Sequence, residues 1–309
     1  MKYIVTGGAG FIGSHIAEYL CRRGDEVIIF DDLFSGRHEN IRDLLEEKNV
    51  TFVEGGVTDP DLLKKTFSGA YGIFHEAAIA SVPRSIKNPL ATHEANITGT
   101  LNVLIAAREC GVKKVVFASS SSVYGDTPTL PKKEEMKPNP ISPYAVSKLA
   151  GEYYCRVFSS VYNIPTVCLR YFNVFGPRQD PNSEYAAVIP RFILRILNNQ
   201  PPVIYGDGNQ TRDFTYVADV VQANILGMDR NIEGVFNIAY GSRISLNELA
   251  ATLLELADVD LTPVFEPPRT GDVRHSLADI CSARSLLGYT PKYTVTSGLQ
   301  ETLQWYQNQ

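Results

Sequence analysis

Cysteine is scarce in this sequence, and long apolar runs are absent. Only five of the 309 residues are cysteine; they are widely scattered, and none belongs to a C-x-x-C pair. Such spacing is typical neither of a zinc site nor of a disulfide framework, so we expect no metal and a cytoplasmic location. No apolar run is long enough to span a bilayer, and the start, MKYIVTGGAG, lacks the charged region and cleavage site of a signal peptide. We therefore expect no membrane partner.

A large excess of charge of one sign is also missing. Lysine and arginine number 29, aspartate and glutamate number 34, and the formal net charge is -5. This balance argues against bulk binding to nucleic acid, although locally placed arginines and backbone amides can still bind a small anion. The apolar fraction of 44% is ordinary for a globular protein, and the length suggests two closely associated domains.

What the sequence does contain is a regular alternation of elements over its first 170 residues. Short apolar runs that suit buried strands occur at Tyr3–Thr6, Glu26–Phe30, Thr51–Val53, Gly72–His75, Lys114–Ala118 and Thr166–Leu169. Helical patterns lie between them, among which are Ile12–Arg23, Ala95–Cys110 and Tyr144–Tyr162. Strands that alternate with helices predict an α/β fold built on a doubly wound parallel sheet.

The pattern changes after Tyr171, where prolines become frequent and the elements shorter. Helical patterns follow at Leu246–Leu256 and Ser297–Gln307. We predict that residues 1–173 plus about 212–242 form the first domain, the second of these segments crossing back to the sheet. Residues 174–211 plus 243–309 then form a smaller mixed α/β domain.

Four glycines separate the first predicted strand from the first helix. They are Gly7, Gly8, Gly10 and Gly13, and the last three satisfy G-x-G-x-x-G. Glycine permits a tight turn and a close approach to a pyrophosphate, while the helix N-terminus offers unpaired N–H groups. Because the motif opens a βαβ unit whose second strand leads to Asp31, it predicts dinucleotide binding rather than a turn without a ligand. A carboxylate there accepts hydrogen bonds from ribose and repels a 2′-phosphate, which favours NAD, although Arg37 lies close enough to suit NADP.

A tyrosine, a lysine and a serine cluster form a second constellation. Tyr144 and Lys148 are four residues apart on one predicted helix face, and the ammonium would lower the pKa of the phenol and make it a base. Such a pair also arises by chance in a chain with 16 tyrosines, so its weight comes from its position after the strand that leads into Ser119–Ser122. A hydroxyl-rich turn is the plain alternative for the serines.

Taken together, TGGAGFIGS, HEAA, ASSSSVYGD, SPYAVSK and LRYFNVFGP resemble the extended short-chain dehydrogenase/reductase family at matching intervals along essentially the whole chain. The resemblance implies that Tyr144 is the acid/base, that Lys148 holds the nicotinamide ribose and that Ser120 orients the reacting oxygen. The cofactor-binding residues that motif and resemblance predict are Gly7, Gly10, Phe11, Ile12, Gly13, Asp31, Ser35, Gly36, Ala77, Ala78, Asn96, Tyr144 and Lys148. One position departs from the pattern: Gly56 stands where relatives usually place an aspartate on the adenine amino group, and Asp59 is a possible substitute.

The second half resembles the nucleotide-sugar branch, especially UDP-galactose and UDP-N-acetylglucosamine 4-epimerases, and so implies a UDP-sugar partner. The resemblance assigns Asn173, Arg212 and Arg269 to the diphosphate region. Val188 and its neighbour Ala187 would lie near the uracil, against whose face Tyr205 would pack. The full set of predicted substrate-binding residues is Ser120, Ser121, Ser122, Asn173, Ala187, Val188, Tyr205, Arg212, Arg269, Asp272 and Ser276.

The residues after Ser120 bear on the type of reaction. Dehydratases of the family have Asp-Glu there and decarboxylases a glutamate, whereas this chain has Ser121 and Ser122, which favours C4 epimerisation through a transient 4-keto sugar. A UDP-glucuronate 4-epimerase, a nucleotide-sugar 4,6-dehydratase and, less favoured, a silent dinucleotide sensor remain alternatives.

Two further expectations follow from the resemblance. Ser276 falls at a position where a bulky side chain would narrow the sugar pocket, so a serine implies UDP-GlcNAc and UDP-GalNAc alongside UDP-glucose and UDP-galactose. The plain alternative is a small residue in a strand or turn. Relatives commonly dimerise through a four-helix bundle, which here would use Ala95–Cys110 and Tyr144–Tyr162.

Overall fold

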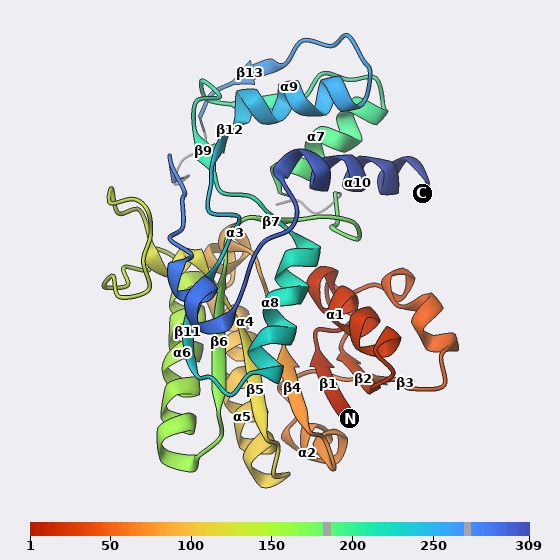
Figure 1. Ribbon diagram of the computed structural model, residues 1–309, viewed down its shortest axis with the longest axis vertical. Helices are drawn as coiled ribbons and strands as arrows, with labels where there is room; N and C mark the ends of the chain where they lie inside the picture. Colours follow the sequence, from red (N-terminus) through yellow and green to blue (C-terminus); the bar gives the residue numbers. More distant parts are fainter. Residues whose placement is uncertain (182–186, 269–272) are drawn as a thin grey trace.

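The computed structural model describes residues 1–181, 187–268 and 273–309 (Figure 1). Seven strands form one sheet in which every neighbouring pair is parallel. In sheet order they are β11 (Gly234–Ile238), β6 (Thr166–Tyr171), β5 (Lys114–Ser120), β4 (Gly72–His75), β1 (Lys2–Thr6), β2 (Glu26–Asp31) and β3 (Val50–Glu54). The predicted doubly wound parallel sheet is confirmed.

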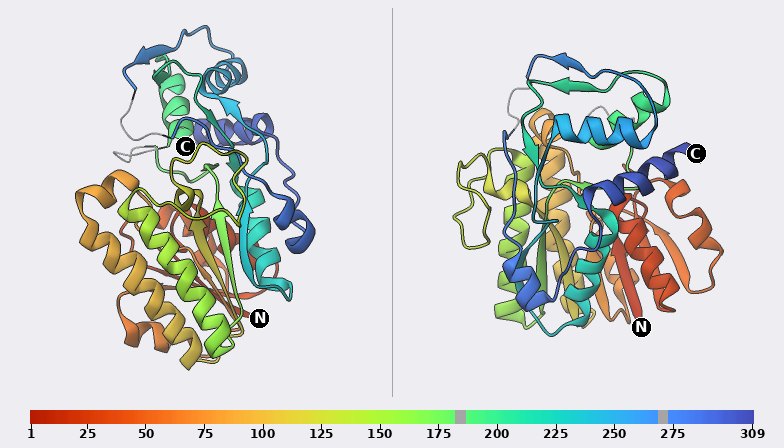
Figure 2. Two further views of the ribbon diagram at one scale, coloured as in Figure 1. Left: turned by 90° about the vertical axis from the view of Figure 1, so that its left-hand side faces the viewer. Right: turned by 45° about the horizontal axis from the view of Figure 1, so that its top comes forward.

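Helices cover both faces of this sheet (Figures 1 and 2). The strands are buried on both sides, so successive side chains enter different cores: Ile4 packs in the core beneath α2, α5 and α6, while Tyr3 and Val5 pack beneath α1 and α8. The helices are α1 (Phe11–Arg22), α2 (Pro60–Phe67), α3 (Val82–Lys87), α4 (Pro89–His93), α5 (Gly99–Glu109), α6 (Pro143–Tyr162), α7 (Val188–Leu197), α8 (Val217–Asp229), α9 (Leu246–Leu256) and α10 (Val295–Gln307).

The strand order reverses between β1 and β4. The chain runs outward from β1 to β2 and β3, and then returns to the other side of β1 to continue as β4, β5 and β6. At such a switch point the loops after the strands part and leave a crevice at the carboxyl ends. The glycine turn follows β1 and HEAA spans the end of β4, so the topology brings both motifs to this crevice.

The observed strands begin or end within two residues of the predicted ones. β6 extends two residues further than its apolar run, because the backbone ladder continues past the last aliphatic side chain to pair Ser120 with Tyr171. The predicted helix Ala95–Cys110 is in fact two segments, a π-helical turn at Glu94–Thr98 followed by α5. The π turn accompanies a side chain that bonds away from its own helix: Asn96 Oδ1 accepts from the backbone N–H of Ile79 at 2.8 Å.

The second lobe consists of three two-stranded sheets, α7, α9 and α10 around their own apolar core (Figure 2). Its short strands are β7 (Val174–Phe175) with β10 (Thr215–Tyr216), β9 (Thr211–Arg212) with β12 (Ile244–Ser245), and β8 (Val203–Tyr205) with β13 (Val264–Glu266). Between them the chain returns to the large sheet, where α8 packs on α1 and β11 pairs with β6. Part of the later chain also packs there, since Ala278, Ile280 and Tyr289 belong to the core beneath α8. The domain boundaries drawn from the sequence stay a prediction.

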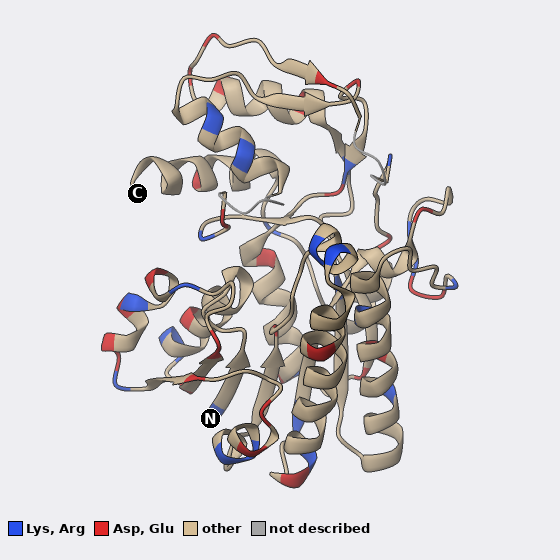
Figure 3. Cartoon of the chain, turned by 180° about the vertical axis from the view of Figure 1, so that it is seen from behind, with Lys and Arg blue, Asp and Glu red and all other residues tan. Residues whose placement is uncertain are grey.

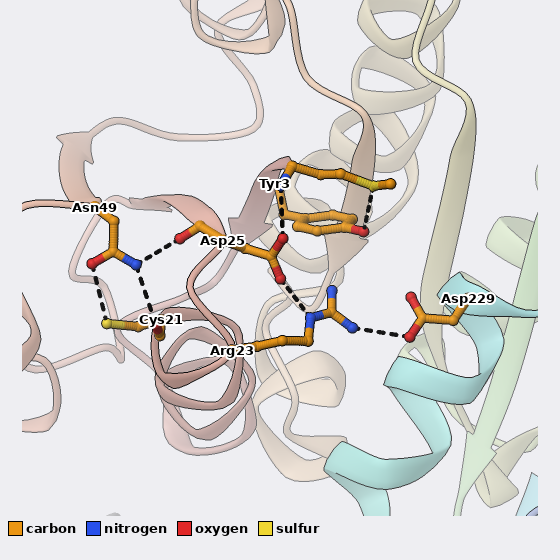
Figure 4. Close-up of polar contacts among 7 residues, drawn as sticks. Tyr3, Cys21, Arg23, Asp25, Asn49 and Asp229 are labelled. Atoms are coloured by element: carbon orange, nitrogen blue, oxygen red, sulfur yellow. Dashed lines mark hydrogen bonds and ion pairs between the residues drawn. The ribbon is translucent and has the colours of Figure 1, made fainter.

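A polar cluster ties α8 to the amino-terminal edge of the sheet, opposite the crevice (Figure 4). Arg23, just after α1, donates to Asp25 and through Nη1 to Asp229 Oδ2 at 2.9 Å, at the end of α8. Asn49 donates to the carbonyl of Asp25 at 2.7 Å, which joins the loop before β3 to the same cluster. The segment that contains α8 and β11 is thus fixed to the start of the chain by polar contacts as well as by its core.

Charged side chains are distributed over most elements. Seen from behind, basic and acidic residues are interspersed over both lobes (Figure 3). Of the residues that the structure describes, no helix is long and apolar enough to cross a membrane.

Candidate active site

The glycine turn is packed too tightly for side chains. Gly7 has φ of +68°, and a Cβ on Gly13 would lie 2.2 Å from the carbonyl oxygen of Gly7. Gly10 is the N-cap of α1 and supplies no capping side chain, so the first N–H groups of the helix, including those of Phe11 and Ile12, face the turn without an intrahelical partner. These features form a cradle for a phosphate group, and they fit the pyrophosphate of a dinucleotide.

Asp31 holds the turn from the neighbouring strand. Its carboxylate is 6% exposed and accepts from the backbone N–H groups of Ala9 at 3.0 Å and Leu33 at 2.8 Å. Burial raises the pKa of this carboxyl, which the hydrogen bonds oppose. Gly36 lies against it, since a Cβ there would be 2.6 Å from Asp31 Oδ1, and Ser35 precedes Gly36 in the exposed loop.

The cation that would suit NADP is already paired. Arg37 Nη2 lies 2.8 Å from Asp180 Oδ2 in the loop after β7. A guanidinium in an ion pair is less available to a 2′-phosphate, so the arrangement of Asp31 and Arg37 fits NAD. At the adenine end, Asp59 is the N-cap of α2 and accepts from Leu62 at 3.0 Å. The carboxylate nearest to Gly56 is instead that of Asp32, whose Oδ2 would lie 3.6 Å from a Cβ at that glycine.

The catalytic residues predicted from the sequence lie together. Ser142 caps α6 by accepting from Ala145, and Pro143 occupies the first turn, so Tyr144 and Lys148 lie on the first two turns. Ser120, at the end of β5, lies close enough to the phenol of Tyr144 to lower its pKa. Lys148 Nζ donates to the carbonyl of Ala118 at 2.7 Å and lies 6.0 Å from the centre of the Tyr144 ring.

A buried ion pair fixes α6 against β6, and a serine hydroxyl joins the same carboxylate to β5. Glu152, one turn after Lys148, accepts from Arg170 of β6 through both oxygens, at 2.8 and 2.7 Å. It also accepts from the hydroxyl of Ser119 at 2.5 Å. Because Ser119 directly precedes Ser120, this contact sets the distance between the catalytic serine and the helix of Tyr144.

The pKa of Tyr144 differs from the sequence-based expectation. Burial raises the pKa of the phenol above its ordinary value, and the hydrogen bond from Ser120 opposes that rise only in part. Burial also lowers the pKa of Lys148 to about 8. The expected lowering of the tyrosine pKa by the ammonium is therefore not found, because desolvation of the phenol is the larger effect in this arrangement.

The serines after β5 form a short 3₁₀ helix, Ser121–Tyr124, that Ser120 caps by accepting from the N–H of Ser122 at 3.2 Å. The Oγ of Ser122 is buried without a hydrogen-bond partner among the residues that the structure describes. A buried hydroxyl without a partner is uncommon in proteins and often marks the place of a missing ligand group.

Across the crevice, a cavity of about 240 Å³ opens in the second lobe. Five predicted substrate-binding residues line it: Asn173, Ala187, Val188, Tyr205 and Arg212. The lining also includes Arg191, which sequence reasoning missed; its Nη2 donates to the hydroxyl of Tyr205 at 3.3 Å.

Ser276 contacts Asn173, which lines this cavity. Asn173 has a left-handed backbone, with φ of 36°, and its Nδ2 donates to the carbonyl of Asp213 at 3.0 Å and to Ser276 Oγ at 3.5 Å. The predicted substrate-binding residues Arg269 and Asp272 lie outside the described residues.

Comparison with known proteins places this geometry in context. Residues 3–239 match the NAD-dependent epimerase/dehydratase family. A putative UDP-glucose 4-epimerase of Methanocaldococcus jannaschii is 40% identical over 99% of this chain and 98% of its own length. The chain belongs to this family. The predicted recognition, the NAD-dependent enzyme class and the cofactor are thereby confirmed.

Two solved structures of family members superpose on nearly the whole chain. A UDP-N-acetylglucosamine 4-epimerase of Methanobrevibacter ruminantium, in complex with UDP-N-acetylmuramic acid, is 42% identical with a TM-score of 0.96 over 99% of this chain and 98% of that one. A UDP-glucose 4-epimerase of Thermotoga maritima, with UDP-glucose, is 39% identical with a TM-score of 0.95 over 100% and 99%. The likeness extends through both lobes and so includes the cavity.

The residues after β4 lie against the glycine turn. Ala77 and Ala78 follow Glu76 here, and a Cβ on Gly7 would lie 2.6 Å from the N atom of Ala77. Asn96 is buried and holds this loop, donating to Ser147 of α6 at 3.0 Å as well as bonding to Ile79. Its polar atoms are therefore used in positioning the loop.

Glu76 is a further residue of the site that sequence reasoning missed. Its Oε1 accepts from the hydroxyl of Tyr171, at the end of β6, at 2.9 Å. Burial raises the pKa of this carboxyl to about 7, against the opposing effects of Tyr171 and Lys148. The signal that could have identified Glu76 from the sequence is its place inside HEAA, one residue past an apolar strand.

Proposed function

We propose that this enzyme inverts the configuration at C4 of a UDP-hexose. The observation that carries the proposal is the close pair of Tyr144 and Ser120, with Ser121 and Ser122 instead of carboxylates after Ser120. Epimerisation requires one group that exchanges a proton with the C4 oxygen, and that group is present. Elimination requires a further acid and base next to Ser120, and serines are poor at both tasks.

The residues divide the reaction between them. Tyr144 takes the proton from the 4-hydroxyl as the C4–H bond breaks and a 4-keto sugar forms, and Ser120 donates a hydrogen bond to the developing carbonyl. NAD, which the glycine turn, Asp31 and Lys148 would hold, would supply the acceptor for the C4 hydride and the source of its return. After the ring presents its other face, the same tyrosine gives its proton back to the oxygen, and the net change is inversion at one carbon.

The second lobe binds the part of the substrate that does not react. In this proposal the diphosphate contacts Arg212 and Arg269, whose planar guanidinium groups suit phosphate oxygens. Tyr205 packs on the uracil, with Ala187 and Val188 beside it. Arg212 already donates to the backbone carbonyls of Thr211 and Arg274 at 3.0 and 3.1 Å, so its position is fixed before a ligand enters.

The substrate range is proposed to include N-acetylated sugars. Ser276 Oγ lies 3.5 Å from Asn173 Nδ2 at the edge of the cavity, and a small residue there leaves volume for an acetamido group. A tyrosine at this position would fill that volume, and overpacking of a tight site costs about 1–3 kcal/mol.

A panel of UDP-sugars tests both parts of this proposal. Purified protein is incubated with UDP-glucose, UDP-GlcNAc and UDP-glucuronate, and products are resolved by chromatography. We expect UDP-galactose and UDP-GalNAc, and Ser276→Tyr should lower the N-acetyl reaction about five- to 150-fold while it spares plain hexoses. A product from UDP-glucuronate alone, or a 4-keto-6-deoxy sugar, would identify one of the alternative activities. Equal losses on both kinds of hexose would exclude Ser276 as the determinant.

We further propose a homodimer through α5 and α6. Apolar side chains at Val146, Tyr153, Val157 and Val161 are 44–60% exposed and repeat at intervals of seven and four residues, which places them on one face of α6. Ile105 of α5 is also exposed. Light scattering should then give about twice the chain mass of 34.2 kDa.

A further inference from the structure

Three neighbouring strands bring polar groups to the same edge of the sheet at the crevice. Glu76 follows β4, Ala118 precedes the end of β5, and Tyr171 ends β6. Lys148 Nζ donates to the carbonyl of Ala118, near the end of β5. The carboxyl of Glu76, directly after β4, accepts from the hydroxyl of Tyr171 at the end of β6. The carboxyl ends of adjacent parallel strands are close in space, so an acidic group and a basic group of the site share this edge.

The carboxyl is held by a chain of hydrogen bonds. Asn224 of α8 donates from Nδ2 to the carbonyl of Val220 at 2.9 Å and to the hydroxyl of Tyr171 at 2.8 Å. Tyr171 in turn donates to Glu76 Oε1 at 2.9 Å. The amide of Asn224 is fully buried, so the orientation of Glu76 is determined by packed groups and does not depend on solvent.

Lys148 is buried without a direct counter-ion. The residue is 4% exposed, its Nζ bonds to one carbonyl, and no carboxylate in the described part of the chain forms an ion pair with it. An ammonium has three donors, so this group relies on partners that the protein does not supply, and burial favours its neutral form.

Few other groups act on this ammonium. His75, before Glu76, is neutral, since both of its ring nitrogens bond to Thr6 and Thr100 and burial lowers its pKa to about 3. Tyr144 and Tyr171 are neutral phenols whose pKa burial raises. The acidic groups that favour a charged Lys148 are Glu76 and, less strongly, the buried thiol of Cys155 on α6.

We propose that Glu76 is a positioning residue for catalysis: its carboxylate, oriented by Tyr171 and Asn224, keeps Lys148 an ammonium. Glu76 acts through Lys148 rather than on the sugar, and so supports the binding of the cofactor by the ammonium. The direct effect of its charge on Tyr144 is the opposite, because it raises the pKa of that phenol. The inference rests on the proposed epimerase function where activity is measured. A second measurement depends on NAD binding alone.

The pH range of the effect follows from the two groups. Burial raises the pKa of Glu76 to about 7, so its charge develops as the pH passes neutrality. Lys148, whose pKa burial lowers to about 8, loses its proton just above that range. Below pH 6 the ammonium persists without help, so removal of the carboxylate should have little effect there. Above pH 7 the variant should lose the ammonium earlier than the wild type.

The test compares Glu76→Gln with the wild type from pH 5.5 to 9. The glutamine keeps an acceptor for Tyr171 and removes only the charge. The loss of a nearby opposite charge shifts a pKa by about one unit or more, so kcat/KM at pH 8 should fall about five- to tenfold relative to its value at pH 6. Glu76→Asp should restore most of the wild-type profile, because it restores the charge.

A matched control is Glu26→Gln, which removes an exposed carboxylate at the far end of β2 and should leave the profile unchanged. The second measurement is the release of NAD from holoenzyme during desalting, which requires no sugar. Glu76→Gln should release NAD about three- to fourfold faster at pH 7.5 than at pH 6, and the wild type at nearly equal rates.

The outcomes separate the two proposals. Uniform loss of activity at every pH, or a profile that coincides with the wild type, would overturn the role of Glu76. If no UDP-sugar is converted by any form of the protein, the proposed function fails, and the NAD release rates still decide the inference. A variant that does not fold is replaced by Tyr171→Phe, which keeps the charge but removes its orientation and should give a smaller change of the same sign.

Discussion

Two alanine substitutions in the glycine turn should have separable effects. In Gly13→Ala the new Cβ would lie 2.2 Å from the carbonyl oxygen of Gly7 and 2.9 Å from Gly8 Cα. Both contacts are with backbone, which cannot rotate away, so α1 must move from β1. In Gly10→Ala the Cβ would lie 3.1 Å from the same oxygen, and φ is -76°, a conformation that alanine adopts freely. Only small shifts are then required.

The magnitudes follow from these distances. Overpacking of a tight site costs about 1–3 kcal/mol, so we expect Gly13→Ala to lower the free energy of unfolding by about that amount. Gly10→Ala should change it by less than about 0.5 kcal/mol, as surface substitutions do. Both should weaken NAD binding, because the Gly10 methyl group lies at the turn that receives the pyrophosphate and the Gly13 methyl group displaces the N-terminus of α1. For Gly13→Ala, displacement of the helix should weaken it about five- to 150-fold.

Urea unfolding without added cofactor and calorimetric titration with NAD measure the two effects independently. The expected pattern is weaker NAD binding in both variants and a lower unfolding free energy in Gly13→Ala alone. Gly24→Ala, at a glycine with φ of +84° far from the crevice, should lose stability through backbone strain without weaker NAD binding, and so controls for the effect of destabilisation alone. If Gly13→Ala unfolds at the wild-type urea concentration, the steric reasoning about this turn is wrong.

Two other predictions concern the same crevice. Tyr144→Phe should reduce turnover about 10²–10⁴-fold, while NAD and UDP-sugar binding, measured by titration, stay nearly unchanged. Ser120→Ala should reduce turnover less, because water can replace one hydroxyl. Near-normal turnover in Tyr144→Phe would remove Tyr144 from the mechanism. The wild type should bind NAD much more tightly than NADP. Asp31→Asn should reduce this difference in affinity, because it removes the charge that repels a 2′-phosphate. Equal dissociation constants for the two cofactors in the wild type would refute the role of Asp31.

Much of the fold was predictable because its determinants are local. Apolar runs mark the buried strands, glycines mark the first turn, and the serine and proline before Tyr144 mark the start of α6. Tyr144 and Lys148 were found from their spacing on one helix. The predicted helix boundaries were less accurate where side-chain hydrogen bonds affect them. Asn96, whose side chain bonds to the loop at Ile79, lies in a π turn that the sequence pattern did not predict.

The parts of the site that could not be predicted depend on contacts between distant segments. Glu76 was quoted within a motif, but its partners Tyr171 and Asn224 are 95 and 148 residues further along the chain, and no local pattern reveals them. The raised pKa of Tyr144 likewise depends on how completely the fold removes water from the phenol. Burial is a property of the assembled crevice, so spacing alone could not give the sign of that shift.

The return of the chain to the large sheet has a consequence for how the protein can be divided. β11 covers the edge of β6, and α8 fills the core against α1, yet both come from residues after the first strand of the second lobe. A fragment that ends at residue 173 would expose the backbone of β6 and the apolar side chains that face α8, which favours aggregation. The two lobes are therefore interleaved in the chain, and exchanging the second lobe between relatives requires cuts on both sides of the segment that contains α8 and β11.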